Sequence, residues 1–273
     1  MAFFPLRDAK PATRAVQAQE AWLERLESDL ARPDLDRNEF CRSVLRDIYY
    51  PEYSGRDIDE LPEALQLSMM NLDQRNITME PEYYVEIDTE QYYRVKPLLW
   101  LWQMFVKSPL SHNVHLGLLF RRMLAPHIFK RCGRDLKCFN FVEFSCGYNL
   151  EVGDDVVIHR NVLLDDRGGI VIGDRVSISD YANIYSHTHS IVDQRNVTLA
   201  ATVLEDDVRI TYHATVLAGV VVGRNAMVGA NAVATRDVRP FHVNVGIPAK
   251  SVRVKPTAPP DISETTTVER SPQ

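Results

Sequence analysis

Apolar residues recur at every sixth position over residues 204–238. The first set in this register is Leu204, Ile210, Val216, Val222, Val228 and Ala234. A second small or branched apolar residue follows each of them by four positions, at Val208, Ala214, Val220, Ala226, Ala232 and Val238. Neither the 3.6-residue period of a helix nor the two-residue period of a strand explains this spacing. The pattern predicts a solenoid of hexapeptides, each a short strand and a turn, with three hexapeptides in one triangular coil.

The same spacing occurs upstream, in two shorter runs. They contain Val152, Ile158 and Leu164, and then Ile172, Ile178 and Ile184. The two runs are offset from each other by two residues, which are inserted at 165–169. Residues 144–163 also align with residues 164–183 as a twenty-residue repeat. The number of positions in register disfavours an ordinary β-sandwich with fortuitous spacing. We therefore predict a β-helix over residues 132–256, with a loop thrown out of it at residues 190–203, where the register breaks.

Residues 1–131 show a helical pattern instead. We expect helices over residues 12–30, from a cap at Asp36 to Ile48, and over residues 61–72. Residues 79–95 are rich in tyrosine and acid and are expected to be a strand or a loop.

Residues 96–131 read as two apolar helices that are broken at Ser108 and Pro109. We expect this pair to cap the open end of the β-helix, which otherwise exposes apolar core and strand edges. The alternative is a membrane-surface hairpin that meets a lipid-linked substrate. Residues 257–273 contain few apolar side chains and are expected to be disordered.

Composition narrows the class of protein. The chain has 273 residues, is 45% hydrophobic and 25% charged, and carries a net charge of −6. These values are normal for a soluble globular protein and give no basic footprint for nucleic acid. The most apolar run, residues 98–106, is too short to span a bilayer, and the N-terminus lacks a signal-peptide pattern. The four cysteines (Cys41, Cys132, Cys138 and Cys146) form no metal-ligand motif, so we expect buried thiols in a reducing cytoplasm.

Three sequence motifs and the loop carry a family resemblance. The motifs are IYSHTHSI at 184–191, VGANAVATRDV at 228–238 and GIPAKSVRV at 246–254. Through them, residues 147–255 resemble the hexapeptide-repeat acyltransferases, and most of all the branch of galactoside, maltose and nodulation-factor O-acetyltransferases. The resemblance implies a left-handed parallel β-helix that forms a homotrimer, with acetyl-CoA in the groove between neighbouring subunits. The left hand rests on the resemblance, because β-crossovers are right-handed as a rule.

By the same resemblance, the chain is an acetyl-CoA-dependent O-acetyltransferase with a small-molecule hydroxyl acceptor and no required metal. In the family, a histidine just before the ejected loop is the general base, and by position this is His189. A neutral imidazole suits the removal of a hydroxyl proton as oxygen attacks the thioester carbonyl. His187, two residues earlier in an extended segment, faces the same side and either orients His189 or replaces it. A solvated turn residue is the alternative for both.

The resemblance also implies residues that contact the acceptor. The family often has an asparagine two coil edges before the histidine, and here that position is His159, with Asn161 two residues on. Asp165 and Asp166 lie in the two-residue insertion at the corner, where the resemblance implies acceptor binding or orientation of the histidine. A solvated corner is the alternative.

The resemblance also implies a binding surface for coenzyme A, formed by small residues and by basic residues. Lysine and arginine would neutralise its phosphates, and glycine would let the pantetheine arm approach the backbone. The implied cofactor-binding residues are Gly219, Gly229, Ala230, Thr235, Arg236, Lys250 and Arg253.

Three other function classes are weighed against this one. A γ-type carbonic anhydrase needs three zinc histidines across a subunit interface, for which His187, His189 and His213 are the candidates. That family's histidine pair five residues apart is missing here, and the GIPAK segment with its basic flank favours CoA. A non-enzymatic β-helix scaffold is disfavoured by two histidines directly before the loop. A sugar nucleotidyltransferase is disfavoured because no glycine-rich nucleotide-binding segment precedes the repeats.

Overall fold

The computed structural model describes residues 10–262 and divides the chain into a helical unit and a β-helical unit. The helical unit ends at Ile128, and the β-helical unit begins at Phe129. Most of the tail that was expected to be disordered, residues 263–273, lies outside the described residues. Each unit is described separately below.

The helical unit consists of five α-helices joined by short 3-10 turns. The helices are α1 (Thr13–Leu30), α2 (Arg37–Tyr49), α3 (Glu63–Met70), α4 (Thr89–Lys107) and α5 (Val114–Ile128). The 3-10 turns are η1 (Pro51–Tyr53), η2 (Ile58–Glu60), η3 (Gln74–Asn76), η4 (Glu80–Tyr83) and η5 (Pro109–His112). Asp36 caps α2 as predicted, because its carboxylate accepts the backbone N–H groups of Asn38 and Glu39.

The expectation of a strand or loop over residues 79–95 is wrong for its second half. Asp88 caps α4 by accepting the N–H of Gln91, and the helix then runs through the rest of the segment. Tyr92 and Val95, three positions apart, are both fully buried. Burial of this one face outweighs the strand preference of tyrosine and valine.

The apolar residues of α4 and α5 form the core of the helical unit. Leu98, Leu101 and Phe105 are fully buried. The ring of Phe105 stacks on Phe120 of α5 with the ring centroids 3.7 Å apart, and Trp22 of α1 stacks on the same ring. Among the described residues, no helix is long and apolar enough to cross a membrane.

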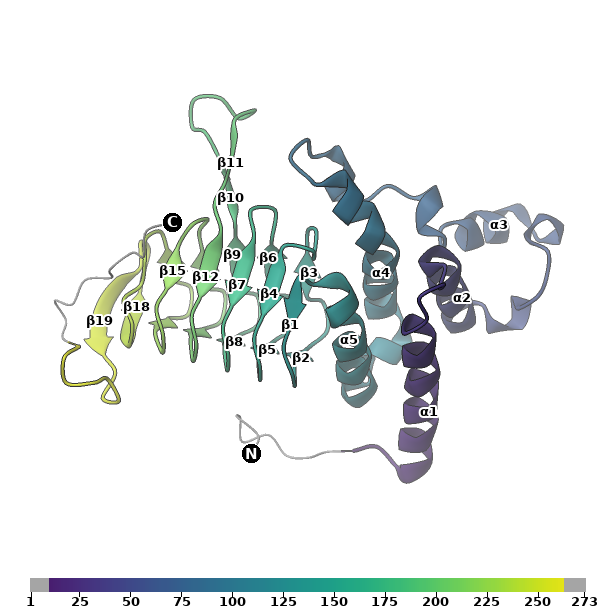
Figure 1. Cartoon of the computed structure of the whole chain (residues 1–273), viewed down its shortest axis with the longest axis horizontal. Coiled ribbons are helices and arrows are strands. Elements are labelled where there is room, and N and C mark those ends of the chain that lie inside the picture. Colours follow the sequence, from purple (N-terminus) through teal and green to yellow (C-terminus); the bar gives the residue numbers. More distant parts are fainter. Residues whose placement is uncertain (1–9, 263–273) are drawn as a thin grey trace. The chain divides into compact units, whose positions relative to one another are not determined.

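The β-helical unit is a stack of rungs with three strands each, so that corresponding strands form three sheets (Figure 1). Sheet A contains β1 (Arg131–Cys132), β4 (Leu150–Val152), β7 (Ile170–Ile172), β12 (Thr202–Leu204) and β15 (Val221–Val222). Sheet B contains β2 (Lys137–Cys138), β5 (Val157–Ile158), β8 (Ser177–Ile178), β13 (Arg209–Ile210), β16 (Met227–Val228), β18 (His242–Val245) and β19 (Lys250–Val254). Sheet C contains β3 (Glu143–Phe144), β6 (Leu163–Asp165), β9 (Asn183–Tyr185), β14 (Thr215–Val216) and β17 (Val233–Ala234).

The six-residue register predicted the interior of this unit correctly. Residues of the first set pair directly along each sheet, as Ile158 pairs with Ile178, Ile178 with Ile210, and Ile210 with Val228. All four are fully buried. The residues four positions further on, such as Val208 and Ala214, are also fully buried. Each coil therefore stacks its apolar side chains on those of the next coil, as a solenoid requires.

The repeated Gly-Asp pairs have a structural role at one corner. Asp174 accepts the backbone N–H of Asp154 one rung below at 2.8 Å, and Asp206 accepts that of Asp174 at 2.9 Å. A Cβ atom on Gly153 would lie 2.7 Å from the backbone carbon of Gly173. Glycine thus permits close stacking, and the aspartates satisfy corner N–H groups that no strand pairs.

The predicted limits of the ejected segment are wrong. The excursion already begins at His187, not at residue 190, and it is a β-hairpin of β10 (His187–His189) and β11 (Val197–Leu199). In Figure 1 this hairpin projects from the stack beyond β9. Thr202 has rejoined sheet A opposite Ile170. His189 is therefore a residue of the hairpin and not the last position of the β-helix edge.

Candidate active site

The candidate site lies in sheet C, where the C-terminal ends of β6 and β9 meet the root of the hairpin. Asp165 is the last residue of β6, and on the next rung β9 ends at Tyr185, directly before Ser186 and β10. The corner residues 165–169 and the hairpin root are therefore neighbours on successive rungs. Both depart from the repeat, and here polar side chains are buried in place of the apolar ones of the regular rungs.

His187 contacts Asp165 across this corner. Its Nδ1 lies 2.6 Å from Asp165 Oδ2, and the two side chains are only 15% and 9% exposed. Burial lowers the pKa of His187, and it raises the pKa of Asp165, while the attraction between the two groups opposes both shifts. The contact is a close approach and not an aligned hydrogen bond, because His187 Nδ1 has no acceptor in hydrogen-bonding geometry among the described residues.

His189 stands beside His187 on the same side of β10, as the sequence predicted. The two ring centroids are 5.3 Å apart in an edge-to-face arrangement. His189 is exposed, and its Nδ1 lies 2.7 Å from the carbonyl oxygen of Gln194 in the hairpin loop. Because a carbonyl oxygen only accepts, Nδ1 must donate, and Nε2 is then free to take a proton.

Ser186 fixes the root of the hairpin and was not singled out from the sequence. It is fully buried. Its hydroxyl donates to the Asp165 carbonyl oxygen at 2.5 Å and accepts the N–H of Gly168 at 2.8 Å. The available signal was its place in the IYSHTHSI motif, directly before the first of the two histidines. Ser186 holds the two adjacent corners together and so sets the distance between Asp165 and His187.

Asp166 occupies a different position from its neighbour. It is completely buried, and its Oδ1 accepts the backbone N–H of Cys146 at 2.7 Å. Burial raises the pKa of Asp166 to about 6, against the opposing effect of hydrogen bonds from the backbone N–H groups around Cys146. Because its side chain is fully buried, Asp166 is hydrogen-bonded inside the β-helix, whereas Asp165 contacts His187.

The two predicted acceptor residues lie away from the histidines within one chain. Asn161 sits at the preceding corner, in the left-handed backbone region at φ 57°. It precedes β6, whereas Asp165 ends that strand, so the length of β6 separates them by about 13 Å. His159 stacks on the ring of Phe139 with 5.1 Å between ring centroids. The structure therefore does not bring His159 and Asn161 together with His187 and His189 in a single chain.

Part of the predicted cofactor track shares the histidine edge. Gly219 follows β14, and the exposed Thr235 and Arg236 follow β17. These strands are the next two in sheet C after β9, so Thr235 lies about 10 Å along the edge from the hairpin root. Gly219 has φ 75°, a conformation that glycine adopts at no steric cost.

The other predicted cofactor residues lie elsewhere on the last coil. Gly229 and Ala230 follow β16, at the opposite end of β17 from Thr235. The structure gives Gly229 a packing reason, because a Cβ atom there would lie 2.6 Å from Val245 Cγ1. Lys250 and Arg253 are exposed on β19, which pairs antiparallel with β18.

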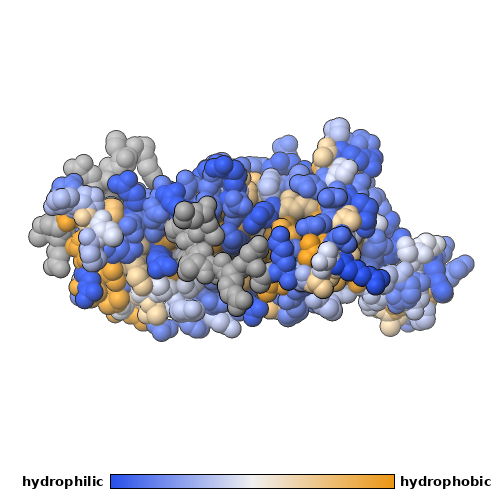
Figure 2. Space-filling view, turned by 90° about the horizontal axis from the view of Figure 1, so that it is seen from below, coloured by the Kyte–Doolittle hydropathy of each residue, from blue (hydrophilic) through white to orange (hydrophobic). Residues whose placement is uncertain are grey.

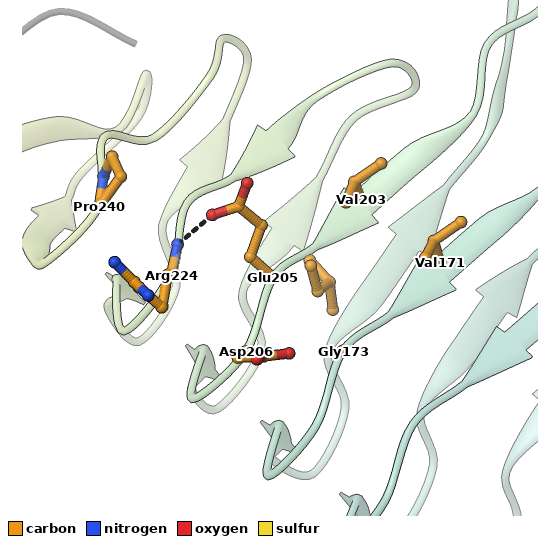
Figure 3. Close-up of a pocket in the computed structure, with 8 residues that line it drawn as sticks. Val171, Gly173, Val203, Glu205, Asp206, Arg224 and Pro240 are labelled. Atoms are coloured by element: carbon orange, nitrogen blue, oxygen red, sulfur yellow. Dashed lines mark hydrogen bonds between the residues drawn. The ribbon is translucent and has the colours of Figure 1, made fainter. Parts of the chain in front are cut away.

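A surface groove of about 410 Å³ lies on another face and does not involve the histidines. Figure 3 shows it along β7, β12 and β15, with Val171 and Val203 on one side and Arg224 on the other. Glu205 Oε2 accepts the backbone N–H of Arg224 at 2.6 Å, drawn as a dashed line. The titratable residues that line this groove are Glu205, Asp206 and Arg224. None of them is a histidine, the residue whose ordinary pKa suits a base near neutral pH, so the histidine edge is the candidate active site.

The third histidine considered for zinc lies apart from the other two. His213 stacks on Tyr181 at a ring-centroid distance of 4.8 Å, at the corner that precedes β14, whereas the hairpin follows the other end of β9. Within residues 10–262, no group of three or more histidine, cysteine, aspartate or glutamate side chains has a metal-binding arrangement.

Comparison with known proteins gives no matching family model. Galactoside O-acetyltransferase of Escherichia coli is 26% identical over 137 residues, which cover 49% of this chain and 68% of that enzyme. A Schizosaccharomyces pombe protein that carries an acetyltransferase name is 31% identical over 114 residues, covering 40% of this chain and 55% of that protein. The chain thus spans little more than half of the latter relative.

Solved structures agree in fold. A hexapeptide-repeat acetyltransferase of Vibrio cholerae in complex with acetyl-CoA has 25% identity and a TM-score of 0.53, covering 67% of this chain and 98% of that one. A maltose O-acetyltransferase of Clostridium difficile, 23% identical, has a TM-score of 0.54 and covers 63% of this chain and 91% of that one. The predicted fold class, a left-handed parallel β-helix of hexapeptide repeats with a helical N-terminal region, is confirmed. In sequence and in fold, the relatives of this chain are hexapeptide-repeat acetyltransferases, the galactoside and maltose O-acetyltransferases among them.

Proposed function

We propose that this chain is a CoA-dependent O-acetyltransferase, which moves an acetyl group from acetyl-CoA to a hydroxyl of a sugar or another small acceptor. The observation that carries the proposal is the pair of adjacent imidazoles on β10, of which His189 has its Nδ1 hydrogen-bonded to a carbonyl oxygen and its Nε2 left to accept a proton. The names of the relatives support the same chemistry, since they include a galactoside O-acetyltransferase and an acetyl-CoA complex.

His189 is the proposed general base. Its Nε2 takes the proton of the acceptor hydroxyl as the oxygen attacks the thioester carbonyl, which forms a tetrahedral intermediate. Collapse of this intermediate breaks the carbon–sulfur bond, and the departing CoA thiolate takes the proton from the imidazolium. No acyl-enzyme is needed when both substrates occupy one site. Base assistance of this kind is worth roughly 10²–10⁴ in rate.

His187 and Asp165 are proposed to position the base. Their short contact ties β10 to the corner of the preceding rung, and Ser186 ties the same two segments through its hydroxyl. This anchoring fixes the strand that carries His189 and restricts the approach of its ring, as catalysis by a positioned group requires. Because burial lowers the pKa of His187, this ring stays neutral at pH values where an exposed histidine begins to titrate.

Acetyl-CoA is proposed to lie along the last coils, with its phosphates near Arg236, Lys250 and Arg253. All three side chains are exposed cations. Gly219 and Thr235 continue the track toward the histidines along the edge of sheet C. The roles of Gly229 and Ala230 would be backbone contacts at the other end of β17.

A homotrimer is proposed, with an active site shared between subunits. The resemblance implies that His159 and Asn161 contact the acceptor, and since they lie away from the histidines within one chain, this role requires a second copy to supply them. Hydrophobic residues also reach the surface at the C-terminal end of the β-helix (Figure 2), where Val245, Ile247 and Val252 are exposed. Exposed apolar side chains of this kind favour burial against a partner.

A cytoplasmic location is proposed on separate grounds. No disulfide joins any of the four cysteines of the chain, Cys41, Cys132, Cys138 and Cys146, all of which lie in the described residues. Cysteines that stay reduced suit a reducing compartment.

A screen of hydroxylated acceptors with acetyl-CoA, followed by detection of free thiol, tests the proposal. The expected result is acceptor-dependent thiol release that His189→Ala reduces strongly and His187→Ala and Asp165→Asn reduce less. Thiol release that no acceptor stimulates would contradict O-acetyl transfer. Activity lost in His187→Ala but retained in His189→Ala would move the base two residues earlier.

A further inference from the structure

The root of the hairpin is formed by the residues at which the chain leaves sheet C and rejoins sheet A (Figure 1). Ser186 lies on the outgoing side, directly before β10, and Thr202 lies on the returning side, as the first residue of β12. Both residues carry a hydroxyl group, and both are fully buried. Ser186 joins the root to the corner at residues 165–169. The Thr202 hydroxyl makes a separate set of contacts, which the stacking of apolar side chains does not require.

The Thr202 hydroxyl holds the two sides of the root together. Its Oγ1 donates to the carbonyl oxygen of Tyr185, the last residue of β9, at 2.6 Å. The backbone N–H of Ala200 donates to the Ser186 carbonyl oxygen at 2.9 Å. One side-chain bond and one backbone bond therefore fix the returning strand against the residues directly before β10. Since β10 carries both histidines, these bonds restrict where the two imidazoles lie.

The same hydroxyl also contacts the next corner along the stack. Thr202 Oγ1 accepts the backbone N–H of Gly219 at 3.0 Å, and the same N–H is shared with the Ala200 carbonyl oxygen at 3.1 Å. In the opposite direction, the backbone N–H of Thr202 donates to the Gly169 carbonyl oxygen at 3.1 Å. Gly219 is one of the predicted cofactor-binding residues, so Thr202 links the root of the hairpin to the surface proposed for acetyl-CoA.

Thr202 departs from the apolar pattern of its sheet. It pairs with Ile170 on β7, which pairs in turn with Leu150 on β4, and both of these side chains are fully buried. A valine of nearly the same shape as threonine would continue this pattern without a polar group to satisfy. Burying a hydroxyl costs free energy unless it is hydrogen-bonded, and at Thr202 the bonds to Tyr185 and Gly219 offset that cost. The position therefore carries a hydroxyl for these contacts and not for packing.

We propose that Thr202 is a positioning residue for acetyl transfer. Its hydroxyl holds the start of β10 at a fixed distance from Gly219 and so aligns His189 with the thioester of acetyl-CoA. Thr202 is buried and acts through these two residues, without contact to either substrate. The inference rests on the proposed function, because it takes His189 as the base and Gly219 as part of the cofactor surface. A displacement of about 1 Å at such a site can cost about 10² in rate.

Hydrogen exchange of the backbone amides, measured by mass spectrometry, tests the contacts without any acetyl transfer. Thr202→Val keeps the size of the side chain but lacks the hydroxyl, and it is expected to speed exchange in residues 187–199 about tenfold, the effect of one lost hydrogen bond. Thr202→Ser keeps the hydroxyl and should exchange like the wild type. Thr202→Ala also lacks the hydroxyl and replaces Thr202→Val if that variant does not fold. Unchanged exchange in the variant without the hydroxyl would overturn the inference.

Thr211→Val is the matched control. Thr211 Oγ1 donates to the Val228 carbonyl oxygen at 2.8 Å, at a corner between sheets B and C that carries no hairpin. Its replacement removes a comparable bond and is expected to lower the melting temperature by about 2–4 °C, as Thr202→Val does, while exchange in the hairpin stays unchanged. Equal acceleration of hairpin exchange in both variants would show a general loss of stability and would contradict the assignment.

Steady-state kinetics test the positioning role itself. Thr202→Val is expected to lower kcat about 10–100-fold with little change in the KM for acetyl-CoA, because the base is displaced while the cofactor surface remains. Thr202→Ser should recover most of this loss, and Thr211→Val should keep the wild-type kcat. Equal kcat in Thr202→Val and Thr211→Val would overturn the positioning role. Absence of acetyl transfer in the wild type would overturn the proposed function and the positioning role with it, whereas the exchange experiment would still decide whether Thr202 holds the root.

Discussion

The regular rungs of the β-helix and the corner where the hairpin leaves it use the chain in opposite ways. In the rungs, residues such as Ile178 and Ile210 are fully buried and stack on equivalent residues above and below. At the corner, Asp165, Ser186 and His187 are polar and contact one another instead of repeating along the stack. Repetition supplies stability, and its interruption supplies a place where polar groups converge. Substitutions in the two regions should therefore have separable effects.

The largest expected effect is on turnover in the hairpin. His189→Ala is expected to lower kcat by about 10²–10⁴, because the proton of the acceptor hydroxyl loses its base. Thermal unfolding and CoA affinity are expected to stay near those of the wild type, since the side chain is exposed. Steady-state kinetics with the acceptor found in the screen, alongside a melting curve, measure both. A fall in melting temperature as large as that of a core variant would remove the distinction between the two regions.

A core substitution should show the reverse. Ile178→Ala removes a fully buried side chain between two rungs and is expected to cost about 2–5 kcal/mol of unfolding free energy. The kcat of the folded fraction should be unchanged. Denaturant unfolding gives the first quantity and active-site-normalised kinetics the second. Val171→Ala, an outward-facing position on sheet A, is the control and should cost far less.

The two regions also differ in how far the sequence predicts them. The sequence predicts the interior positions because apolar residues recur every six positions, and these are the residues that stack from rung to rung in the structure. The limits of the hairpin were not predicted, since residues 187–189 continue the extended pattern of β9 and only their partner on β11 shows that they have left the stack. The resemblance implied that Asp165 or Asp166 binds the acceptor or orients the histidine, but only the pairing of β6 with β9 shows that Asp165, and not Asp166, lies against His187. The predicted roles of these residues remain predictions.

Asp166 offers a test of the corner through pH. Its folded-state pKa of about 6 lies above its ordinary value of 3.8, so the folded chain holds this proton more tightly than the unfolded chain. The associated stability is complete below about pH 3.8 and is lost as the pH rises through about 6, a change on the order of 3 kcal/mol. Asp166→Asn cannot ionise and should lack this loss. Unfolding free energies of both proteins from about pH 4 to pH 8 measure it, and a difference that does not vary with pH would refute the account of this buried carboxyl.

The smallest expected effect concerns the cofactor. Replacing Lys250 and Arg253 together by alanine should raise the KM for acetyl-CoA about tenfold, because two exposed cations near its phosphates contribute of order 1 kcal/mol together. The KM for the acceptor should change little. Substrate-saturation curves for each substrate separate the two effects. Equal weakening for both substrates would place the CoA phosphates elsewhere on the surface.

The most direct test of the central claim is to identify the product formed from acetyl-CoA that carries a ¹³C-labelled acetyl group. Mass spectrometry of the acceptor, together with a thiol assay, should find one labelled acetyl ester for each CoA released. His189→Ala should lower the initial rates of both equally, under saturating substrates and without a change in fold. Thiol release without an acetylated acceptor, or an ester formed as fast by His189→Ala as by the wild type, would contradict acetyl transfer at the hairpin.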